Sequence, residues 1–315
     1  MTDTLGSVGE AGVLARIFPR LPHATGELLG PGDDAAVVAA PDGRVVITTD
    51  MMIHGPDFRL AWSTAHDLGW KAAASNLADV AAMGAVPTAL VVALAAPAET
   101  EVAFLESFAD GLRDGCAALA PGCGVVGGDL SVSSTLTIAV TAFGDLEGRA
   151  PVTRSGARVG DIVAVSGVLG AAAHGLKLLF ASAPEPDASA AAALKREHPA
   201  AVAAQLAPTP PIADGRAAAI AGATAMLDLS DGLAIDARRL AAASGVALDL
   251  HATVAELEGG EDHSLLATFP AGTALPGGFK VIGEVVDGAG LRVDGEPYDE
   301  RSGWDPYAGW DGVAG

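Results

Sequence analysis

Five short motifs in this chain place a carboxylate beside glycine, serine, threonine or asparagine, and these residue types can hold metal ions. They are Gly32-Asp33-Asp34-Ala35-Ala36, Thr48-Thr49-Asp50, Asn76-Leu77-Ala78-Asp79, Gly127-Gly128-Asp129 and Asp228-Leu229-Ser230-Asp231-Gly232. Carboxylates gathered from five places would repel one another unless cations held them. Hard oxygen ligands suit Mg²⁺, which commonly binds phosphates at the same time. The motifs therefore predict a magnesium and phosphate site.

Each motif also has a plain structural interpretation, and taken singly none of them decides between the two. These interpretations are a turn at Asp33 and Asp34, a strand end at Asp50, a solvated position at Asp79 and a first-turn charge at Asp231. Five such motifs, all expected at strand ends or on one helix face, favour the metal and phosphate site.

Other kinds of catalytic site are absent from the sequence. Lys71 and Lys177 lack the glycine spacing of a P-loop, and no Gly-x-Ser-x-Gly elbow occurs. The seven histidines are scattered, with no Cys-His pair and no evident general base. Carboxylates, hydroxyls and glycines remain, and they suit direct phosphoryl transfer, in which positioning and electrostatics do most of the catalysis.

The charge balance excludes several classes of partner. The net charge of −21 on 315 residues argues against binding to nucleic acid or to an anionic membrane surface. No apolar run is long enough for a membrane span, and the N-terminus lacks a signal-peptide pattern. Cys116 and Cys123 are expected to be buried small residues rather than a disulfide. We expect a soluble, cytoplasmic protein.

The residues of the motifs need strands and helices to position them. An apolar strand is predicted over 44–50, with Asp50 at its end, and a helix over 63–83, capped by Ser63 or Thr64 and closed by Gly84. On that helix Lys71, Ser75 and Asp79 are spaced by four residues and share one face. A polar strip is therefore expected along an alanine-rich helix.

Strands and helices alternate along the rest of the chain, and then two strands adjoin, which indicates an α/β or α+β fold of mixed sheets packed with helices. Strands are predicted over 88–95, 124–129, 136–143, 161–166, 224–229 and 280–286, and helices over 99–119, from about 170 to 180, in part of 181–204, and over 231–243 with Ser230 as its cap. A polar stretch over 145–160 resembles a linker. We therefore expect two domains, residues 1–148 and 149–315.

The same motifs resemble those of the thiamine-monophosphate kinase family. The resemblance rests on the five motifs and on three further stretches of sequence. These are the longer run Asn76-Leu77-Ala78-Asp79-Val80-Ala81-Ala82-Met83-Gly84-Ala85, then Arg154-Ser155-Gly156-Ala157 and Gly259-Gly260-Glu261-Asp262. The resemblance covers the chain from about residue 12 to about residue 305. The family belongs to a superfamily with aminoimidazole ribonucleotide synthetase, selenophosphate synthetase and the hydrogenase maturation dehydratase.

The resemblance implies an ATP- and Mg²⁺-dependent transfer of the γ-phosphoryl group to thiamine monophosphate. It also implies the superfamily's two-domain architecture, with an N-terminal domain that binds ATP and Mg²⁺ and dimerises, and a C-terminal domain that completes the site of a homodimer. The implied metal ligands are Asp33, Thr48, Thr49, Asp50, Asp79, Asp129, Asp228 and Asp231. The implied ATP contacts are Gly128, Asp129, Arg154 and Ser230, the substrate contacts Asp57, Glu261 and Trp304, and the catalytic residues Asp50, Asp129 and Arg154.

The chain departs from the family pattern at the acceptor positions. The family's Gly-x-His-Phe is Gly55-Pro56-Asp57-Phe58 here, and its aromatic residue after Gly-Gly-Glu-Asp is His263. Its C-terminal Gly-Trp-Asp-His-Phe is Gly303-Trp304-Asp305-Pro306-Tyr307. These differences bear on the choice of acceptor and leave the ATP and metal motifs intact.

Two alternatives remain beside the kinase interpretation. The first is another enzyme of the superfamily acting on a different phosphorylated acceptor; selenophosphate synthetase would need a reactive N-terminal cysteine, and none precedes Cys116. The dehydratase would need a C-terminal cysteine, and the chain ends in Gly312-Val313-Ala314-Gly315. The second is a nucleotide-binding protein that has lost turnover, against which the complete metal set argues.

Overall fold

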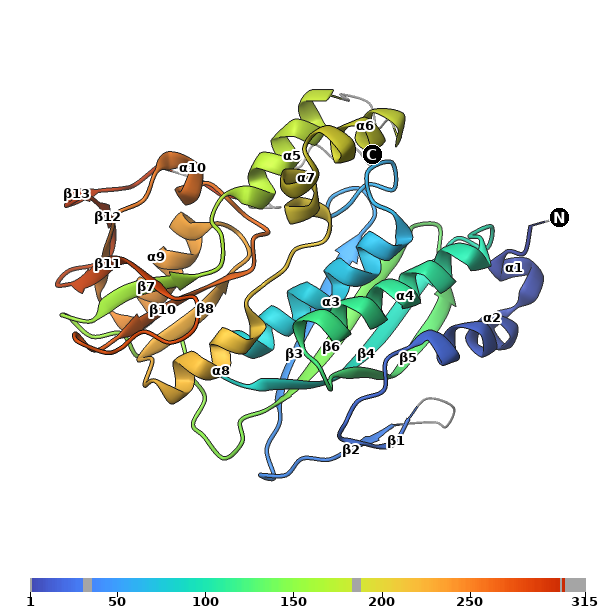
Figure 1. The fold of residues 1–315 in the computed structure, drawn as a ribbon, viewed down its shortest axis with the longest axis horizontal. Coiled ribbons are helices and arrows are strands. Elements are labelled where there is room, and N and C mark those ends of the chain that lie inside the picture. Colours follow the sequence, from blue (N-terminus) through green and yellow to red (C-terminus); the bar gives the residue numbers. More distant parts are fainter. Residues whose placement is uncertain (1, 31–35, 183–187, 301, 304–315) are drawn as a thin grey trace.

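The computed structural model describes residues 2–30, 36–182, 188–300 and 302–303 (Figure 1). The chain forms a four-stranded sheet from its first half and a seven-stranded sheet from its second half, beside a two-stranded ribbon near the N-terminus. Both larger sheets are mixed and carry helices, so the predicted α/β (α+β) class with mixed sheets is confirmed.

The first sheet has the strand order β3-β6-β4-β5, in which only β4 and β5 run parallel. Its strands are β3 (Val46–Ile53), β4 (Val86–Ala96), β5 (Gly124–Val132) and β6 (Thr137–Asp145). Helices α3 (Ala65–Ala82) and α4 (Val102–Leu119) cover one face, which we call the inner face (Figure 1). The N-terminal elements are α1 (Leu5–Val8), α2 (Glu10–Ile17), a 3₁₀ turn (Phe18–Arg20), β1 (Glu27–Leu29) and β2 (Val37–Val38).

Alternation along the strands decides which side chains reach the inner face. Val92, Ile138 and Val140 point inward and form one core with Leu68 and Leu77 of α3. The opposite face, which we call the outer face, leaves Ile47, Met51 and Ile53 of β3 exposed. The first sheet is therefore covered by helices on one side only.

The second sheet has the order β13-β12-β9-β11-β7-β10-β8. Its strands are β7 (Ile162–Ser166), β8 (Ala225–Leu229), β9 (Ala247–Leu250), β10 (Ser264–Phe269), β11 (Lys280–Val286), β12 (Gly290–Val293) and β13 (Glu296–Pro297). The helices of this half are α5 (Ala171–Ser182), α6 (Ala188–Glu197), α7 (Pro199–Leu206), α8 (Ile212–Ile220), α9 (Leu233–Ser244) and α10 (Val254–Leu257).

Helix α3 lies between the two sheets and contacts both (Figure 1). Thr64 caps it, since its hydroxyl accepts from the amide of Asp67 while the Asp67 carboxylate accepts from the amide of Thr64 at 2.9 Å. Gly84, with φ of 72°, follows its C-terminus in the left-handed conformation that glycine adopts without strain. The predicted start and end of this helix are confirmed.

Two local predictions are wrong, and two short strands were missed. Strands β3 and β5 run three residues past Asp50 and Asp129, so these carboxylates lie within strands and not at strand ends. Ser230 does not cap α9; the carboxylate of Asp236 accepts from the amides of Asp231 and Gly232 instead. The short strands β9 and β10 were not predicted, because brief apolar runs are equally compatible with helix.

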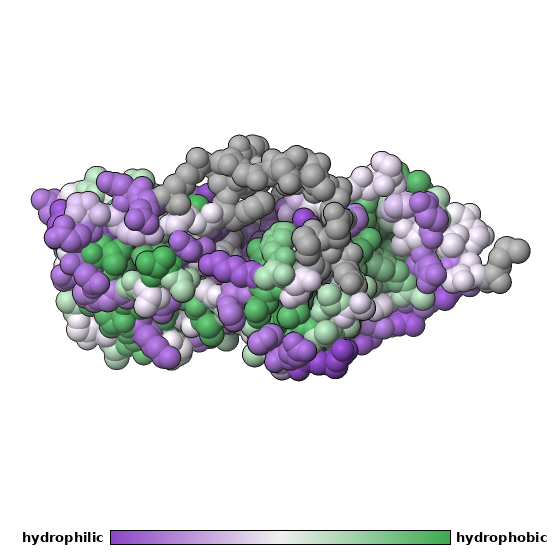
Figure 2. All heavy atoms as spheres, turned by 90° about the horizontal axis from the view of Figure 1, so that it is seen from above, coloured by the Kyte–Doolittle hydropathy of each residue, from purple (hydrophilic) through white to green (hydrophobic). Residues whose placement is uncertain are grey.

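Viewed from above, the surface is hollowed between the two halves of the molecule, and hydrophilic residues border the hollow (Figure 2). Cys116 and Cys123 are buried free thiols, as expected. Across the described ranges, no helix combines the length and apolar character needed to cross a membrane.

Candidate active site

Three carboxylates from separate segments meet between α3 and the two sheets. Asp50 lies in β3 opposite Val140, whose side chain belongs to the inner-face core, so Asp50 also faces inward. Asp79 is near the end of α3, and its carboxylate accepts a hydrogen bond from the Thr48 hydroxyl at 2.9 Å. Asp228 reaches the same place from β8 of the second sheet. We call Asp50, Asp79 and Asp228 the carboxylate cluster.

His263 joins the carboxylate cluster to α3. Its Nδ1 lies 3.2 Å from the carboxylate of Asp228, and its Nε2 lies 3.2 Å from the hydroxyl of Ser75. His263 is 4% exposed, so both contacts are shielded from water. Burial alone would lower the pKa of His263, but the hydrogen bond to Asp228 and the nearby charge of Glu261 raise it.

The carboxylates of the cluster are close enough to disturb one another's ionisation. Burial, followed by repulsion from Asp228, raises the pKa of Asp79 to about 7. Partial desolvation also raises the pKa of Asp50; repulsion from Glu261 and Asp228 adds to this, and His263 opposes it. Asp50 and Asp79 are therefore charged only at a cost in free energy, which is typical of carboxylates that bind a cation.

The donor atoms of the cluster fit a hard divalent cation. In the part of the chain that the structure describes, no three Asp, Glu, His or Cys side chains converge closely enough to hold one ion by themselves. Mg²⁺ does not need such a cage, since it commonly takes one or two carboxylates and completes its shell with water and substrate phosphates. Asn76, one turn before Asp79, has a buried Oδ1 atom without a hydrogen-bond partner in the structure, and this oxygen suits a bound water or ion.

The structure does not bring Thr49 and Asp129 to the cluster. The Thr49 hydroxyl donates to the carbonyl of Val140 at 3.0 Å. The same Thr49 hydroxyl accepts a hydrogen bond from the hydroxyl of Thr141 at 3.2 Å. Asp129 alternates with Leu130, which belongs to the inner-face core, so Asp129 points to the outer face. Three strand spacings, about 14 Å, separate β5 from β3. Both predicted ligands therefore lie on the outer face of the first sheet.

The predicted ATP contacts Arg154, Ser230 and Gly128 lie on three separate segments of the chain. Arg154 is exposed in the segment between the sheets, where its carbonyl accepts from Ser244 at 2.7 Å. The carbonyl of Ser230, at the end of β8, accepts from the amide of Glu261 at 2.7 Å. Gly128 lies so close to β4 that a Cβ would clash with the carbonyl oxygen of Val92, so strand packing alone requires glycine there. Asp231 forms an ion pair with Arg239 at 2.6 Å.

The predicted acceptor contacts Asp57 and Glu261 lie near each other. The carboxylate of Asp57 accepts from the amide of Ile53 at 2.7 Å. Burial raises the pKa of Asp57, and the charge of Glu261 raises it further. Glu261 forms an ion pair with Lys71 of α3 at 2.5 Å. The predicted residues Asp33, Trp304 and Pro306 lie outside the described residues.

Sequence reasoning placed Lys71 and Ser75 on the polar strip and noted His263 only as a departure from the family pattern. Lys71 is 5% exposed and Ser75 is 6% exposed, so the strip is buried against the second half of the chain. The sequence signal for a functional face was the four-residue spacing of a lysine, a serine and an aspartate on an alanine-rich helix. For His263 no local pattern indicates that it meets both Ser75 and Asp228.

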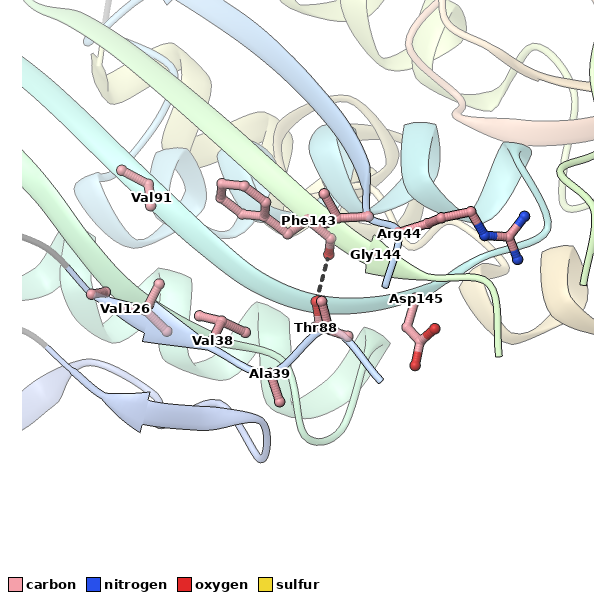
Figure 3. Close-up of a pocket in the computed structure, with 12 residues that line it drawn as sticks. Val38, Ala39, Arg44, Thr88, Val91, Val126, Phe143, Gly144 and Asp145 are labelled. Carbon is pink, nitrogen blue, oxygen red and sulfur yellow. Dashed lines mark hydrogen bonds between the residues drawn. The ribbon is translucent and has the colours of Figure 1, made fainter. Parts of the chain in front are cut away.

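A separate pocket of about 310 Å³ opens on the outer face, away from the cluster (Figure 3). Val91, Val126 and Phe143 form its apolar wall, and the Thr88 hydroxyl donates to the carbonyl of Phe143 at 3.1 Å. Arg44 and Asp145 are the charged residues at its border. None of the carboxylate cluster lines this pocket, so the candidate active site is the cluster on the inner face.

Comparison with known proteins identifies relatives of the whole chain. Residues 32–146 match the model of the AIR synthase related protein, N-terminal domain. A thiamine-monophosphate kinase of Mycobacterium tuberculosis is 43% identical over 98% of this chain and 93% of its own length. One of Corynebacterium glutamicum is 38% identical over 90% of this chain and 87% of its own length. The structure of AaThiL complexed with AMPPCP and TMP superposes with a TM-score of 0.74 at 31% identity, covering 96% of this chain and 99% of that one.

Proposed function

Because the chain belongs to the thiamine-monophosphate kinase family, we propose that the carboxylate cluster carries out the direct, in-line transfer of the ATP γ-phosphoryl group to thiamine monophosphate. The chain is thus an ATP-dependent thiamine-phosphate kinase whose product is thiamine diphosphate. The observation that carries the mechanism is the meeting of Asp50, Asp79 and Asp228, from three distant segments, at one place between the sheets. This arrangement concentrates negative charge where two phosphate groups must be held by cations.

We propose Mg²⁺ as the resident cation, held by one or two carboxylates of the cluster Asp50, Asp79 and Asp228 at a time, with water and substrate phosphates completing its shell. When bound, Mg²⁺ neutralises phosphate charge and so stabilises the transferring group. The Thr48 hydroxyl holds one oxygen of Asp79, and His263 holds one oxygen of Asp228, so each carboxylate keeps an oxygen for the ion. Asp33 and Asp231 complete the proposed set.

A general base is not required for this reaction. The second pKa of a phosphate monoester is about 6, so the acceptor oxygen is already ionised at neutral pH. The protein's task is then to align the acceptor with the γ-phosphorus and to offset repulsion between the two phosphates. We assign Gly128, Ser230 and Arg154 to ATP, with the Arg154 guanidinium offsetting charge on the transferring group.

We propose that Asp57, Glu261 and Trp304 bind the acceptor. Thiamine monophosphate carries a cationic thiazolium ring, which a carboxylate attracts and an aromatic side chain can stack on. Asp57 and Glu261 are near enough for their charges to interact, and they lie beside the carboxylate cluster. The acceptor's cationic ring and its phosphate would thus be held at adjacent places.

A homodimer that covers the outer face of the first sheet explains the position of Thr49 and Asp129. Ile47, Met51 and Ile53 of β3 are 61%, 54% and 37% exposed on that face. An uncovered apolar strip of this kind is typical of a protein interface. In such a dimer Thr49 and Asp129 would lie at the shared surface and serve nucleotide binding from there. An Ile47→Glu variant that remains dimeric in light scattering would contradict this proposal.

We further propose that residues 1–148 and 149–315 are two domains, since each of the two large sheets falls within one of these ranges. We place the protein in the cytoplasm, where ATP is available and where the free thiols of Cys116 and Cys123 would stay reduced. Expression of residues 149–315 alone, followed by a cooperative unfolding transition, tests the division.

The activity is tested with purified protein, ATP, MgCl₂ and thiamine monophosphate, with thiamine diphosphate measured by chromatography. Free thiamine serves as the control acceptor, since it lacks the ionised phosphate. Product from the monophosphate alone supports the proposal. Direct transfer is tested with γ-labelled ATP in the absence of acceptor, where label retained on the denatured protein would contradict it.

A further inference from the structure

The segment that carries Glu261 and His263 has an unfavourable backbone conformation. Glu261 has φ of 67° and His263 has φ of 50°, in the left-handed region that non-glycine residues seldom adopt. Such conformations persist when the surrounding structure holds them, and they concentrate at functional sites. Their amides donate to the carbonyls of Ser230 at 2.7 Å and Leu229 at 3.0 Å, which fixes the segment to the end of β8.

Helix α3 holds the side chains of the same two residues. The Lys71 ammonium lies 2.5 Å from the carboxylate of Glu261, and the Ser75 hydroxyl lies 3.2 Å from Nε2 of His263. Lys71 and Ser75 are one helical turn apart, so neighbouring positions on one face meet neighbouring positions of the segment. The Lys71 ammonium also donates to the carbonyl of Gln205 at 3.3 Å. The strained segment is therefore held between β8 and α3.

The ion pair is asymmetric in its exposure. The Lys71 side chain is 6% exposed, whereas the Glu261 side chain is 35% exposed. A buried ammonium requires a partner, so Lys71 stays with Glu261 and Gln205. One side of the Glu261 carboxylate is thus fixed by Lys71, while another side remains open to a ligand.

We propose that Lys71 is a positioning residue for the acceptor, because it fixes the Glu261 carboxylate and the strained segment in the place that receives the cationic ring of the substrate. This inference rests on the proposed acceptor-binding role of Glu261. Lys71 touches neither phosphate nor metal in this role and acts through Glu261. Loss of Lys71 should therefore weaken acceptor binding and leave ATP binding intact.

The first test compares Lys71→Met with Lys71→Arg and with the control Lys195→Met. Lys195, on α6, pairs with Asp67 of α3 at 2.6 Å and not with a residue of the segment. We expect Lys71→Met to raise the KM for thiamine monophosphate about tenfold, as for one lost charge-assisted contact, with the KM for ATP changed less than about twofold. Lys71→Arg should recover most of the affinity, and Lys195→Met should resemble the wild type. An unchanged acceptor KM in Lys71→Met, or an equal rise for both substrates, overturns the proposal.

A double-mutant cycle with Glu261→Gln sharpens the test. If Lys71 acts through Glu261, then Lys71→Met should change the acceptor KM little further in the Glu261→Gln background. The double variant also leaves no unpaired buried carboxylate or ammonium, so it keeps the test available should Lys71→Met alone fold poorly. An undiminished tenfold effect of Lys71→Met in that background overturns the proposal.

Hydrogen exchange of the segment separates this inference from the proposed function. We expect the peptide over residues 258–265 to exchange about tenfold faster in Lys71→Met than in Lys195→Met, without any substrate present. If the wild type fails to phosphorylate thiamine monophosphate, the proposed function fails, and the exchange result still decides whether Lys71 holds the segment. If the wild type is active and the variant keeps both its acceptor KM and its protection, the positioning role alone fails.

Discussion

The carboxylates of the site and those of α4 are organised in opposite ways. On α4, Asp110 accepts from Arg20 at 2.5 Å and from Arg113 at 2.5 Å. Within the carboxylate cluster, the hydrogen-bond partners found are the Met51 amide for Asp50, the Thr48 hydroxyl for Asp79 and His263 for Asp228, and arginine takes no part. The same residue type is therefore neutralised by the fold in one place and left to a ligand in the other.

Ionisation follows this difference. The hydrogen bond from His66 and the contact with Arg113 lower the pKa of Asp114 on α4. Burial and the charge of Asp228 raise the pKa of Asp79 to about 7. Carboxylates paired with arginine on the surface support the fold weakly, whereas Asp50 and Asp79, whose pKa values are raised, oppose folding in their charged forms when no cation is bound. The comparison teaches that carboxylates without an arginine partner and with raised pKa values distinguish the carboxylate cluster from the surface of α4.

The largest expected effect is on turnover, when a carboxylate of the cluster loses its charge. Asp50→Asn, Asp79→Asn and Asp228→Asn should each lower kcat by about 10²-fold or more at saturating Mg²⁺, because a major electrostatic stabiliser is lost. Asp129→Asn should do the same if the outer face contributes to the site. Steady-state kinetics measure this, with Asp114→Asn as the control. Near-normal turnover in Asp79→Asn would contradict the proposal that the carboxylate cluster is needed for catalysis.

The next effect is on the pH dependence of stability without metal. The pKa of Asp79 is about 7 in the folded protein, above its ordinary value of 3.8, so the folded state holds a proton that the unfolded state releases. Stability from this group is present below about pH 4 and is lost as the pH rises towards 7. In EDTA, the wild type should therefore lose on the order of 2 kcal/mol of unfolding free energy between pH 5 and pH 8, relative to Asp79→Asn. Urea titrations at both pH values measure the difference, and parallel pH profiles of the two proteins would contradict it.

A third effect is the response to Mg²⁺ alone. At pH 8, Mg²⁺ should raise the melting temperature of the wild type by a few degrees, because an ion that binds only the folded state stabilises it. Asp79→Asn should respond less, and Ca²⁺ at equal concentration provides a comparison of ion size. Differential scanning fluorimetry without nucleotide measures this. Equal shifts in the wild type and Asp79→Asn would place the ion elsewhere.

The smallest effect is expected on α4. Asp114→Asn removes an exposed carboxylate that contacts His66 and Arg113, and exposed ion pairs contribute less than about 1 kcal/mol. Its kcat should stay within about twofold of the wild type. A large loss of activity in this variant would show that the arginine-paired carboxylates of α4 are also needed for catalysis.

Local patterns predicted the elements well and the faces of the strands less well. The caps of α3 and the spacing of Lys71, Ser75 and Asp79 depend on neighbouring residues, so the sequence was sufficient for the polar strip. Asp50 and Asp129 were expected together at strand ends, whereas they lie within strands and on opposite faces of one sheet. That outcome depends on strand order and on a bulge in β5, and both are set by contacts between distant segments.

The contact of His263 with Ser75 and Asp228 was beyond sequence reasoning for the same reason. Residues 75, 228 and 263 are brought together by the packing of α3 against the second sheet, and no local pattern encodes that packing. Glu261 and its neighbours were expected at the substrate site from motif resemblance, but their partner Lys71 was not identified. Side-chain contacts between the two halves of the chain could therefore not be predicted from the sequence and are known only from the structure.

Helix α3 carries Lys71, Ser75 and Asp79 on one continuous face, and this has a consequence for how the gene can change. A single inserted residue between Lys71 and Asp79 would turn everything on one side of it by about 100° relative to the other. The residue that meets Glu261 and the residue that meets Thr48 could then no longer point the same way. Many residues of this helix can be replaced by others of similar size, whereas the number of residues between Lys71 and Asp79 cannot change.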